Sequence, residues 1–300
     1  MRVNPNYMSN LVSSLDASSS AEETLTEELA SGSQVNALSD NPVAAGENVI
    51  LSAQLAGDDS FSQTAASAQS MLQVSDSALS EVTSQLTTAI SLATEANTGT
   101  MNASNLQSIS GQIAGIRDEV VSLANTTYLG QYIFSGGQGG TEPYTLDTSV
   151  SPAVATYQGD SDVTWLETPN GQSIQLNVPG SQIFSAAGSN VLGTLNALVA
   201  DFASGTPSST AQADTQALST SLGYVSQQRV VIDNSLTRLT AAENYTQSEQ
   251  TQLTSVQTNL LQADLGQVAT QLSTAETQQT ALSQVITAIG GQSLFNDLQN

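Results

Sequence analysis

The sequence predicts a mainly α protein with a β insertion: an elongated antiparallel hairpin in which N- and C-terminal helices pair, plus a small β-rich domain. Three observations support this fold class. Apolar residues recur every three or four positions in both terminal parts of the 300-residue chain, as they do on one face of a helix. No proline follows Pro207. Glycines, prolines and aromatic residues concentrate between residues 128 and 185, where the helical spacing stops.

In the first predicted helix the stripe residues recur in steps of three and four, but the middle of the stripe is polar. We therefore expect a helix that is only marginally stable on its own. Gly32 is a plausible end for this helix, because glycine accepts the backbone angles of a helix C-terminus. Asn41 and Pro42 then suit the cap and first turn of a second helix. The stripe of the first helix contains Met8, Leu11, Leu15, Ser18, Glu22, Leu25 and Leu29.

Two further helices follow, with cleaner apolar stripes. The second is expected to end near Gly99, and the third has the strict spacing of a coiled coil. We interpret both stripes as intramolecular core. The stripe of the second helix comprises Phe61, Ala65, Ala68, Leu72, Ser75, Leu79, Val82, Leu86, Ala89 and Ala93. That of the third comprises Leu106, Ile109, Ile113, Ile116, Val120, Leu123 and Thr127.

The middle of the chain predicts a β-rich domain with its own modest core. Residues 131–135, 162–168 and 172–178 have the composition of strands. Pro169, Asn170 and Gly171 lie between the last two, and Asn-Gly favours a type I′ hairpin turn. The single tryptophan, Trp165, falls on this hairpin.

Helix is expected again from about Asn190 to Ser204 and, after a break at Gly205 to Pro207, to the C-terminus. The last part is predicted as one rod of about 80 residues, roughly 120 Å long. Its stripe shifts phase by one residue after Leu260. Such a stripe must be covered, either by the N-terminal helices or by other chains.

Composition excludes several classes of function. Twenty-seven acidic residues face four arginines (Arg2, Arg117, Arg229, Arg238), with no lysine, so the net charge is −23. This charge disfavours nucleic acid and anionic membranes as partners. Histidine and cysteine are absent, which removes the commonest general base, metal ligands and every thiol reaction. The sequence shows no stretch of 18 apolar residues and, in residues 1–15, no secretory signal peptide.

No candidate catalytic group stands out. Glu22, Glu23, Glu27 and Glu28 could serve acid–base chemistry, but a solvated helix face is the simpler interpretation. Asp160, Asp162 and Glu167 could bind calcium, yet they lack the spacing of a complete binding loop. The glycine pairs 136–137 and 139–140 lack the lysine and immediate helix of a phosphate loop, so we interpret them as a turn. We therefore expect no enzyme, no metal and no cofactor.

The two chain ends instead predict an assembly interface, because each offers an apolar stripe with no evident partner domain. We assign this interface to Leu11, Leu15, Leu25, Leu29, Leu265, Val268, Leu272, Leu282, Ile286, Leu294, Phe295 and Leu298.

Two short motifs stand out, a loop-to-helix motif at residues 35–46 (VNALSDNPVAAG) and a glycine–tyrosine–phenylalanine motif at residues 130–137 (GQYIFSGG). They resemble motifs of bacterial flagellins and of their relatives in the hook-associated protein 3 family, which join hook to filament. Residues 157–160 (YQGD) and 177–180 (NVPG) match its β domain. C-terminal similarities lie at Arg238-Leu239, 242–244 (AEN), 263–265 (ADL) and 293–298 (SLFNDL).

The resemblance implies a structural role in the flagellum. Residues 1–40 and 261–300 would form an axial core, residues 41–127 and 190–260 a helical rod, and residues 128–189 an outer β domain. It also implies self-assembly, contacts with a neighbouring hook-associated protein and with flagellin, and an extracellular location. Export would be unfolded, without a cleavable signal peptide, with a cytoplasmic chaperone on the C-terminal helix.

Two alternatives stay open. A flagellin proper would polymerise into the filament itself. A secreted helical adhesin or type III needle-tip protein would have stable ends and bind a host surface.

Overall fold

The computed structural model describes residues 5–297, with side chains from residue 7 to residue 288. The predicted fold class is confirmed: long helices dominate, and short antiparallel sheets interrupt them. The helices are α1 (Pro5–Ser31), α2 (Pro42–Ala96), α3 (Ala103–Ala124), α4 (Gly180–Ile183), α5 (Val191–Ala203), α6 (Ala211–Leu261) and α7 (Leu265–Asp297).

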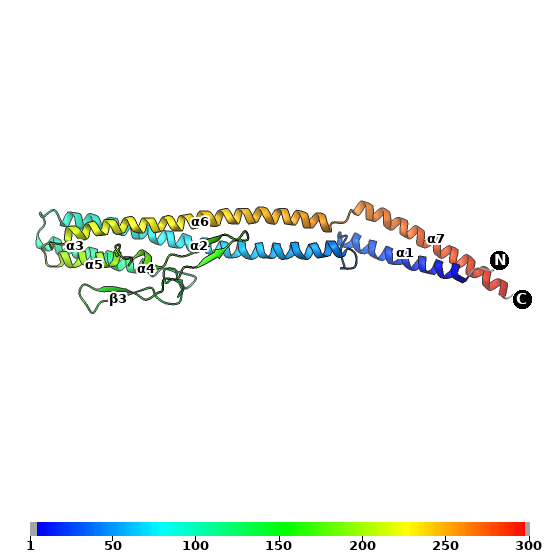
Figure 1. Cartoon of the computed structure of the whole chain (residues 1–300), viewed down its shortest axis with the longest axis horizontal. Helices are drawn as coiled ribbons and strands as arrows, with labels where there is room; N and C mark the ends of the chain where they lie inside the picture. Colours follow the sequence, from blue (N-terminus) through cyan, green and yellow to red (C-terminus); the bar gives the residue numbers. More distant parts are fainter. Residues whose placement is uncertain (1–4, 298–300) are drawn as a thin grey trace. The chain divides into compact units, whose positions relative to one another are not determined.

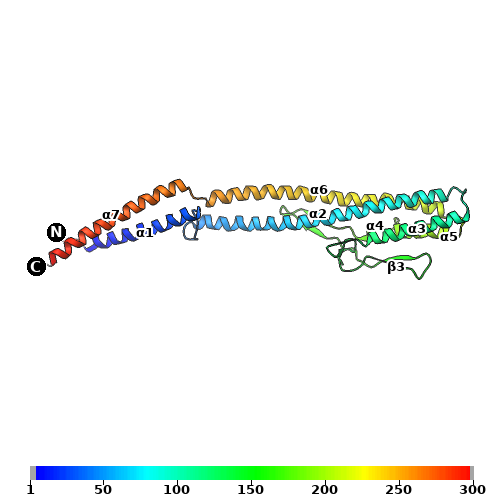
Figure 2. The ribbon, with the colours of Figure 1, turned by 180° about the vertical axis from the view of Figure 1, so that it is seen from behind.

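The chain forms two compact units. The first comprises Met1–Ala56 with Glu249–Asn300, and the second comprises Gly57–Ser248. In the second unit α2 lies beside α6, and α3 lies beside α5, in both views (Figures 1 and 2). Hydrogen bonds tie these pairs, from Asn97 Nδ2 to Thr215 Oγ1 (2.9 Å) and from Ser110 Oγ to the carbonyl of Val199 (2.7 Å).

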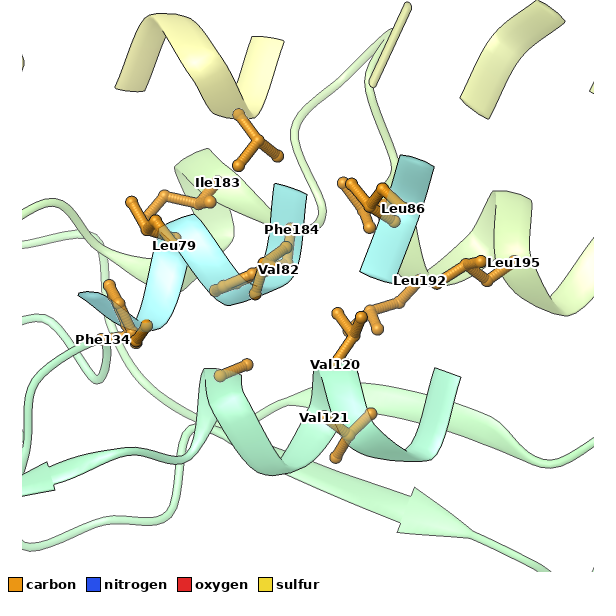
Figure 3. Close-up of a cluster of buried hydrophobic side chains, with 14 of the residues drawn as sticks. Leu79, Val82, Leu86, Val120, Val121, Phe134, Ile183, Phe184, Leu192 and Leu195 are labelled. Atoms are coloured by element: carbon orange, nitrogen blue, oxygen red, sulfur yellow. The ribbon is translucent and has the colours of Figure 1, made fainter. Parts of the chain in front are cut away.

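The apolar stripe predicted for α2 is the core of the second unit. All ten of its residues are buried, and Leu72, Leu79, Val82 and Leu86 are at most 1% exposed. Figure 3 shows Leu79, Val82 and Leu86 in one cluster with Ile183 of α4, Val120 of α3 and Leu192 of α5. The α3 stripe is buried from Leu106 to Val120, and Leu123 is partly buried. Thr127, the last predicted residue of the stripe, instead lies in β1 and is exposed, because α3 ends at Ala124. The heptad-like spacing thus places one face of each helix inward.

The strands pair only locally. Among the described residues they form three two-stranded antiparallel sheets, β1 with β2, β3 with β4, and β5 with β6. The strands predicted from the sequence do not include β1, β3 or β4, which are too short to separate from loop. The strands are β1 (Thr127–Tyr128), β2 (Gln131–Tyr132), β3 (Tyr144–Asp147), β4 (Val154–Tyr157), β5 (Trp165–Glu167) and β6 (Ser173–Gln175).

The hairpin between β5 and β6 is confirmed, but its predicted turn type is wrong. A type I′ turn needs positive φ at both central residues, which here are Pro169 and Asn170. In this turn the residue with positive φ is instead Gly171 (φ 78°), which follows them. Its N–H donates to the carbonyl of Thr168 at 2.8 Å. This is a turn over Pro169 and Asn170 followed by a left-handed glycine, which proline's fixed negative φ favours.

The β-rich segment has no core of its own, contrary to the prediction. Phe134, Tyr144 and Phe184 are at most 1% exposed and belong to the same buried cluster as the helices. The Phe184 ring packs edge-to-face on Phe134 (centroids 5.6 Å apart) and on Tyr144 (5.8 Å). Two-stranded sheets cannot bury both faces, so these aromatic residues use the helical bundle as their second layer.

The few cations link elements of the second unit. Each arginine whose side chain is described donates a hydrogen bond to another element: Arg117 to Asn196 (3.1 Å), Arg229 to Asp76 (2.8 Å), and Arg238 to the carbonyl of Ser173 (2.9 Å). The hydrogen bond to the Asp76 carboxylate raises the pKa of Arg229. None of these contacts was visible from sequence spacing.

The predicted continuous C-terminal rod is broken. α6 ends at Leu261 and α7 begins at Leu265, so the phase shift after Leu260 marks a helix boundary. Asp264 caps the new helix, because its Oδ1 accepts from the N–H groups of Gly266 (3.0 Å) and Gln267 (3.1 Å). Within the described residues, no helix is long and apolar enough to cross a membrane.

Because the core is shared, Phe134→Ala should destabilise the helices and the β segment together. We expect the unfolding free energy to fall by about 3–5 kcal/mol. Far-UV circular dichroism reports the helices and Trp165 fluorescence reports the β segment, so both urea transitions should shift by the same amount. Val154→Ala, at an exposed position of β4, is the control and should change little. A shift of the fluorescence transition alone would contradict the shared core.

Candidate assembly interface

The first unit is built on the pair of α1 and α7. The two helices lie side by side in both views (Figures 1 and 2). Ser18 Oγ donates to the carbonyl of Ala275 across the pair at 3.4 Å. The structure thus brings the two predicted halves of the interface together.

The pair leaves its apolar stripe incompletely covered. Leu11, Leu15 and Leu25 on α1 are only partly buried, and Leu29 is 39% exposed. Two helices offer each other one narrow seam, so much of every large side chain remains in water.

On α7 the placement is similar. Val268 is 5% exposed, whereas Leu265 is 49% exposed, and Leu272, Leu282 and Ile286 are partly buried. Of the remaining assigned residues, Leu294 and Phe295 fall within α7 but their side chains are not described, and Leu298 lies outside the described residues.

The two units differ sharply in the size of their buried apolar side chains. In the first unit, the described apolar side chains that are buried are small, namely Ala44, Ala45, Ala263, Val268 and Ala275. In the second unit the buried set includes leucine, isoleucine and phenylalanine at 0% exposure. The first unit therefore has a seam without a complete core, which favours packing against other chains.

The sequence analysis missed a further exposed apolar surface at the start of α2. Val43 is 72% exposed, Val49 63% and Ile50 62%, all within the first unit. Their sequence signal was present, since apolar residues recur here out of phase with the buried Ala44 and Ala45. These side chains extend the candidate interface beyond α1 and α7.

The connection between α1 and α2 meets the connection between α6 and α7. Ser33 and Gln262 form an antiparallel bridge. The N–H of Gln34 donates to the carbonyl of Leu261 (2.8 Å), and that of Ala263 to the carbonyl of Gly32 (2.9 Å). We call residues 32–34 with 261–263 the joint.

Gly32 ends α1 as predicted and also forms part of the joint. Its φ of 70° is the left-handed conformation in which a helix C-terminus commonly closes. Its N–H donates to the carbonyl of Glu28 at 2.8 Å, while its own carbonyl accepts from Ala263. Because α1 ends at Ser31, the carbonyl of Gly32 is not used within the helix and can accept from the segment between α6 and α7.

The motif of residues 35–46 is a set of caps. Asn41 Oδ1 accepts from the N–H of Ala44 (3.1 Å), which starts α2. Asp40 Oδ2 accepts from the N–H groups of Ala37 (2.6 Å) and Asn36 (3.0 Å). These bonds, that to Ala37 first, lower the pKa of Asp40 below its ordinary 3.8.

Asp160, one of the residues considered as a calcium ligand, has a structural role. Asp160 Oδ1 accepts from the N–H groups of Gly137 (2.7 Å) and Asp162 (3.0 Å), which fixes the glycine turn and lowers the pKa of Asp160. Glu167 lies in β5 and is exposed. Among the described residues, no group of three or more acidic side chains is placed to hold a metal ion.

The carboxylates of α1 do not form one surface. Glu22 is partly buried, with one carboxylate oxygen buried and lacking a hydrogen-bond partner, whereas Glu23 and Glu27 are exposed. Glu28 is partly buried.

The fold is that of flagellin-like proteins. Residues 3–138 match the family described as the bacterial flagellin N-terminal helical region. A structure from Vibrio parahaemolyticus, described as a flagellar hook-associated protein, aligns with a TM-score of 0.65 at 21% identity, over 74% of this chain and all of that one. This likeness shows the fold and confirms the flagellin-like class.

More particularly, the chain is similar to proteins named flagellar hook-associated protein 3. The protein of that name from Salmonella typhimurium is 28% identical over 169 residues, which is 56% of this chain and 51% of the relative. The resemblance drawn from the motifs is thereby confirmed. The flagellin of Bacillus subtilis is 29% identical over 153 residues, 50% of this chain and 48% of the relative. The matches span about half the length of these relatives.

The cap on residues 36–37 predicts an acid-sensitive loop. Because the folded pKa of Asp40 is depressed, its contribution to stability is present above pH 3.8 and is lost as pH falls through the folded value. A carboxyl-carbon NMR titration should give Asp40 a midpoint below 3.8. Ala37→Pro removes one N–H donor and should raise this midpoint, whereas Ser39→Ala should move it less. A midpoint at or above 3.8 in the unaltered chain would show that the cap does not form.

Proposed function

We propose that this protein is a structural axial component of the bacterial flagellum that joins hook to filament by helical self-assembly. One observation carries the proposal: the α1–α7 pair leaves its large apolar side chains partly exposed, so it gains from packing against further chains. The homologues named hook-associated protein 3 support this assignment. The proposed interface includes the twelve residues assigned from the sequence and the exposed apolar side chains at the start of α2.

The same proposal includes partners and location. Copies of the chain would pack through the terminal helices, and the ends of the assembly would contact a neighbouring hook-associated protein and flagellin. The protein would be exported unfolded to the cell exterior without a cleavable signal peptide, with a chaperone on α7 beforehand. Helices that cannot bury their stripe alone are suited to ordering on assembly.

The three-part division also remains a proposal. Residues 1–40 and 261–300 would form the axial core, residues 41–127 and 190–260 the rod, and residues 128–189 an outer domain. The boundary near residues 40 and 261 is supported by the joint, where both chain passages leave one helix and enter the next. We assign no catalytic role to the chain, in keeping with its structural homologues.

A flagellin role is the second candidate, favoured by the similarity to the Bacillus subtilis flagellin. An adhesin would be the remaining alternative. The deciding experiment incubates the purified full-length protein with isolated hooks and, separately, with filament fragments, under salting-out conditions, followed by negative-stain electron microscopy. Capping of hooks without extension supports the junction role. Long filaments of this protein alone would make it a flagellin, and binding to neither would favour the adhesin.

Partly buried leucines of the pair should be needed for assembly and not for the second unit. Replacing Leu15 or Leu272 by Gln should weaken hook capping by about tenfold each, because each loses on the order of 1–2 kcal/mol of apolar burial. The readout is the protein concentration at half-maximal capping. Val154→Gln, exposed on β4, is the control. Equal loss in the control, or no loss in the leucine variants, would contradict this interface.

Assembly should also depend on charge. Copies of charge −23 repel one another once their carboxylates ionise. In about 10 mM salt, where the screening length is roughly 30 Å, the sedimenting fraction should fall as pH rises from about 4 to 7. It should recover in about 1 M salt, where that length is roughly 3 Å. Assemblies that stay intact at neutral pH in low salt would refute this repulsion.

A further inference from the structure

Two grooves flank the α1–α7 pair, and they differ in charge. The first, which we call the uncharged groove, has a volume of about 540 Å³ and is lined by Ala21, Thr24, Leu25, Thr270, Thr274 and Ala275 together with two glutamines. The second, the acidic groove, has a volume of about 570 Å³ and includes Glu22, Glu23, Glu27 and Thr26. Thr24 and Thr26 are two residues apart, hence about 200° apart around α1, so the grooves lie on opposite sides of it.

Small side chains make up most of the lining of the uncharged groove. Two alanines and three threonines are among its lining residues, and such side chains let another helix approach closely. Leu25, one of the lining residues, is only partly buried, so an occupant would remove further apolar surface from water.

The charge of the chain selects which groove a second copy can use. Any copy carries a net charge of −23, so the three carboxylates of the acidic groove oppose its approach. The uncharged groove presents no such charge among its lining residues.

The same reasoning selects the occupying helix. α1 carries five carboxylates, at Asp16, Glu22, Glu23, Glu27 and Glu28. α7 carries Glu276 as the only charged residue between residues 265 and 288. Its exposed residues are otherwise mostly Ser, Thr, Gln and Ala, which hydrogen-bond or pack without net charge. An uncharged groove therefore matches α7 better than α1.

We infer that the uncharged groove between α1 and α7 receives helix α7 of a second copy of this chain, while the acidic groove stays in contact with solvent. This inference rests on the proposed self-assembly and adds to it a face, an occupant and a direction for the packing of copies.

The chain offers a closely matched pair of variants for the test. Thr24 and Thr26 are both exposed threonines of α1, and each hydroxyl donates to a carbonyl four residues earlier, to Ser20 (3.0 Å) and Glu22 (2.7 Å). Thr24→Glu and Thr26→Glu therefore add the same charge and remove the same hydrogen bond on opposite sides of one helix. We expect Thr24→Glu to raise the protein concentration for half-maximal self-association at least tenfold, and Thr26→Glu to raise it less than threefold, by sedimentation in about 150 mM salt, where the screening length is about 8 Å.

A photo-crosslinking amino acid at position 24 or 26 identifies the occupant by mass spectrometry. Position 24 should cross-link to residues 265–288 of another copy, and position 26 should give few intermolecular products. Equal weakening by both charge variants, or cross-links from position 24 to α1 of the other copy, would overturn the inference while leaving self-assembly intact. Failure of the unaltered chain to associate or to cap hooks would instead overturn the proposed function, so the two failures are distinguishable.

Discussion

The structure depends on how many helices share an apolar seam. In the second unit five helices and the β segment surround one cluster, so Leu79 and Phe134 are at most 1% exposed. In the first unit two helices face each other, and Leu15 and Leu25 keep part of their surface in water. Burial of large side chains needs neighbours on several sides. The first unit alone thus leaves its large apolar side chains incompletely covered, whereas the second unit covers its own.

Charge gives a second constraint. With no lysine and four arginines, the chain has few cations. The three described arginines all connect elements within the second unit, at Asn196, Asp76 and Ser173. None of them lies on α1 or α7. The two helices of the α1–α7 pair differ in charge: α1 carries five carboxylates, whereas Glu276 is the only charged residue of α7 between residues 265 and 288.

Helix caps explain why certain short motifs stand out. Asn41 and Asp264 begin α2 and α7, and Asp40 holds the preceding loop. Their backbone acceptors and donors are local, so the sequence carried a readable signal at each. The joint is different, because the Ser33–Gln262 bridge pairs residues more than 200 positions apart. No local sequence pattern indicates which distant segment will hydrogen-bond to a backbone group that a helix end leaves unpaired.

The sequence by itself determined most of the long helices, their inward faces and the absence of the usual catalytic side chains, because spacing, caps and composition are properties of the chain. All ten predicted stripe residues of α2 are buried, whereas the phase shift after Leu260 marks the end of α6 and not a shift within one rod. Only the tertiary structure decided that Phe134 and Phe184 join the helical core and that Arg238 reaches the Ser173 carbonyl. Only the tertiary structure shows that the apolar seam of the second unit is covered and that the seam of the first unit is partly exposed. Burial depends on what lies opposite in space, and the chain's periodicity carries no record of that neighbour.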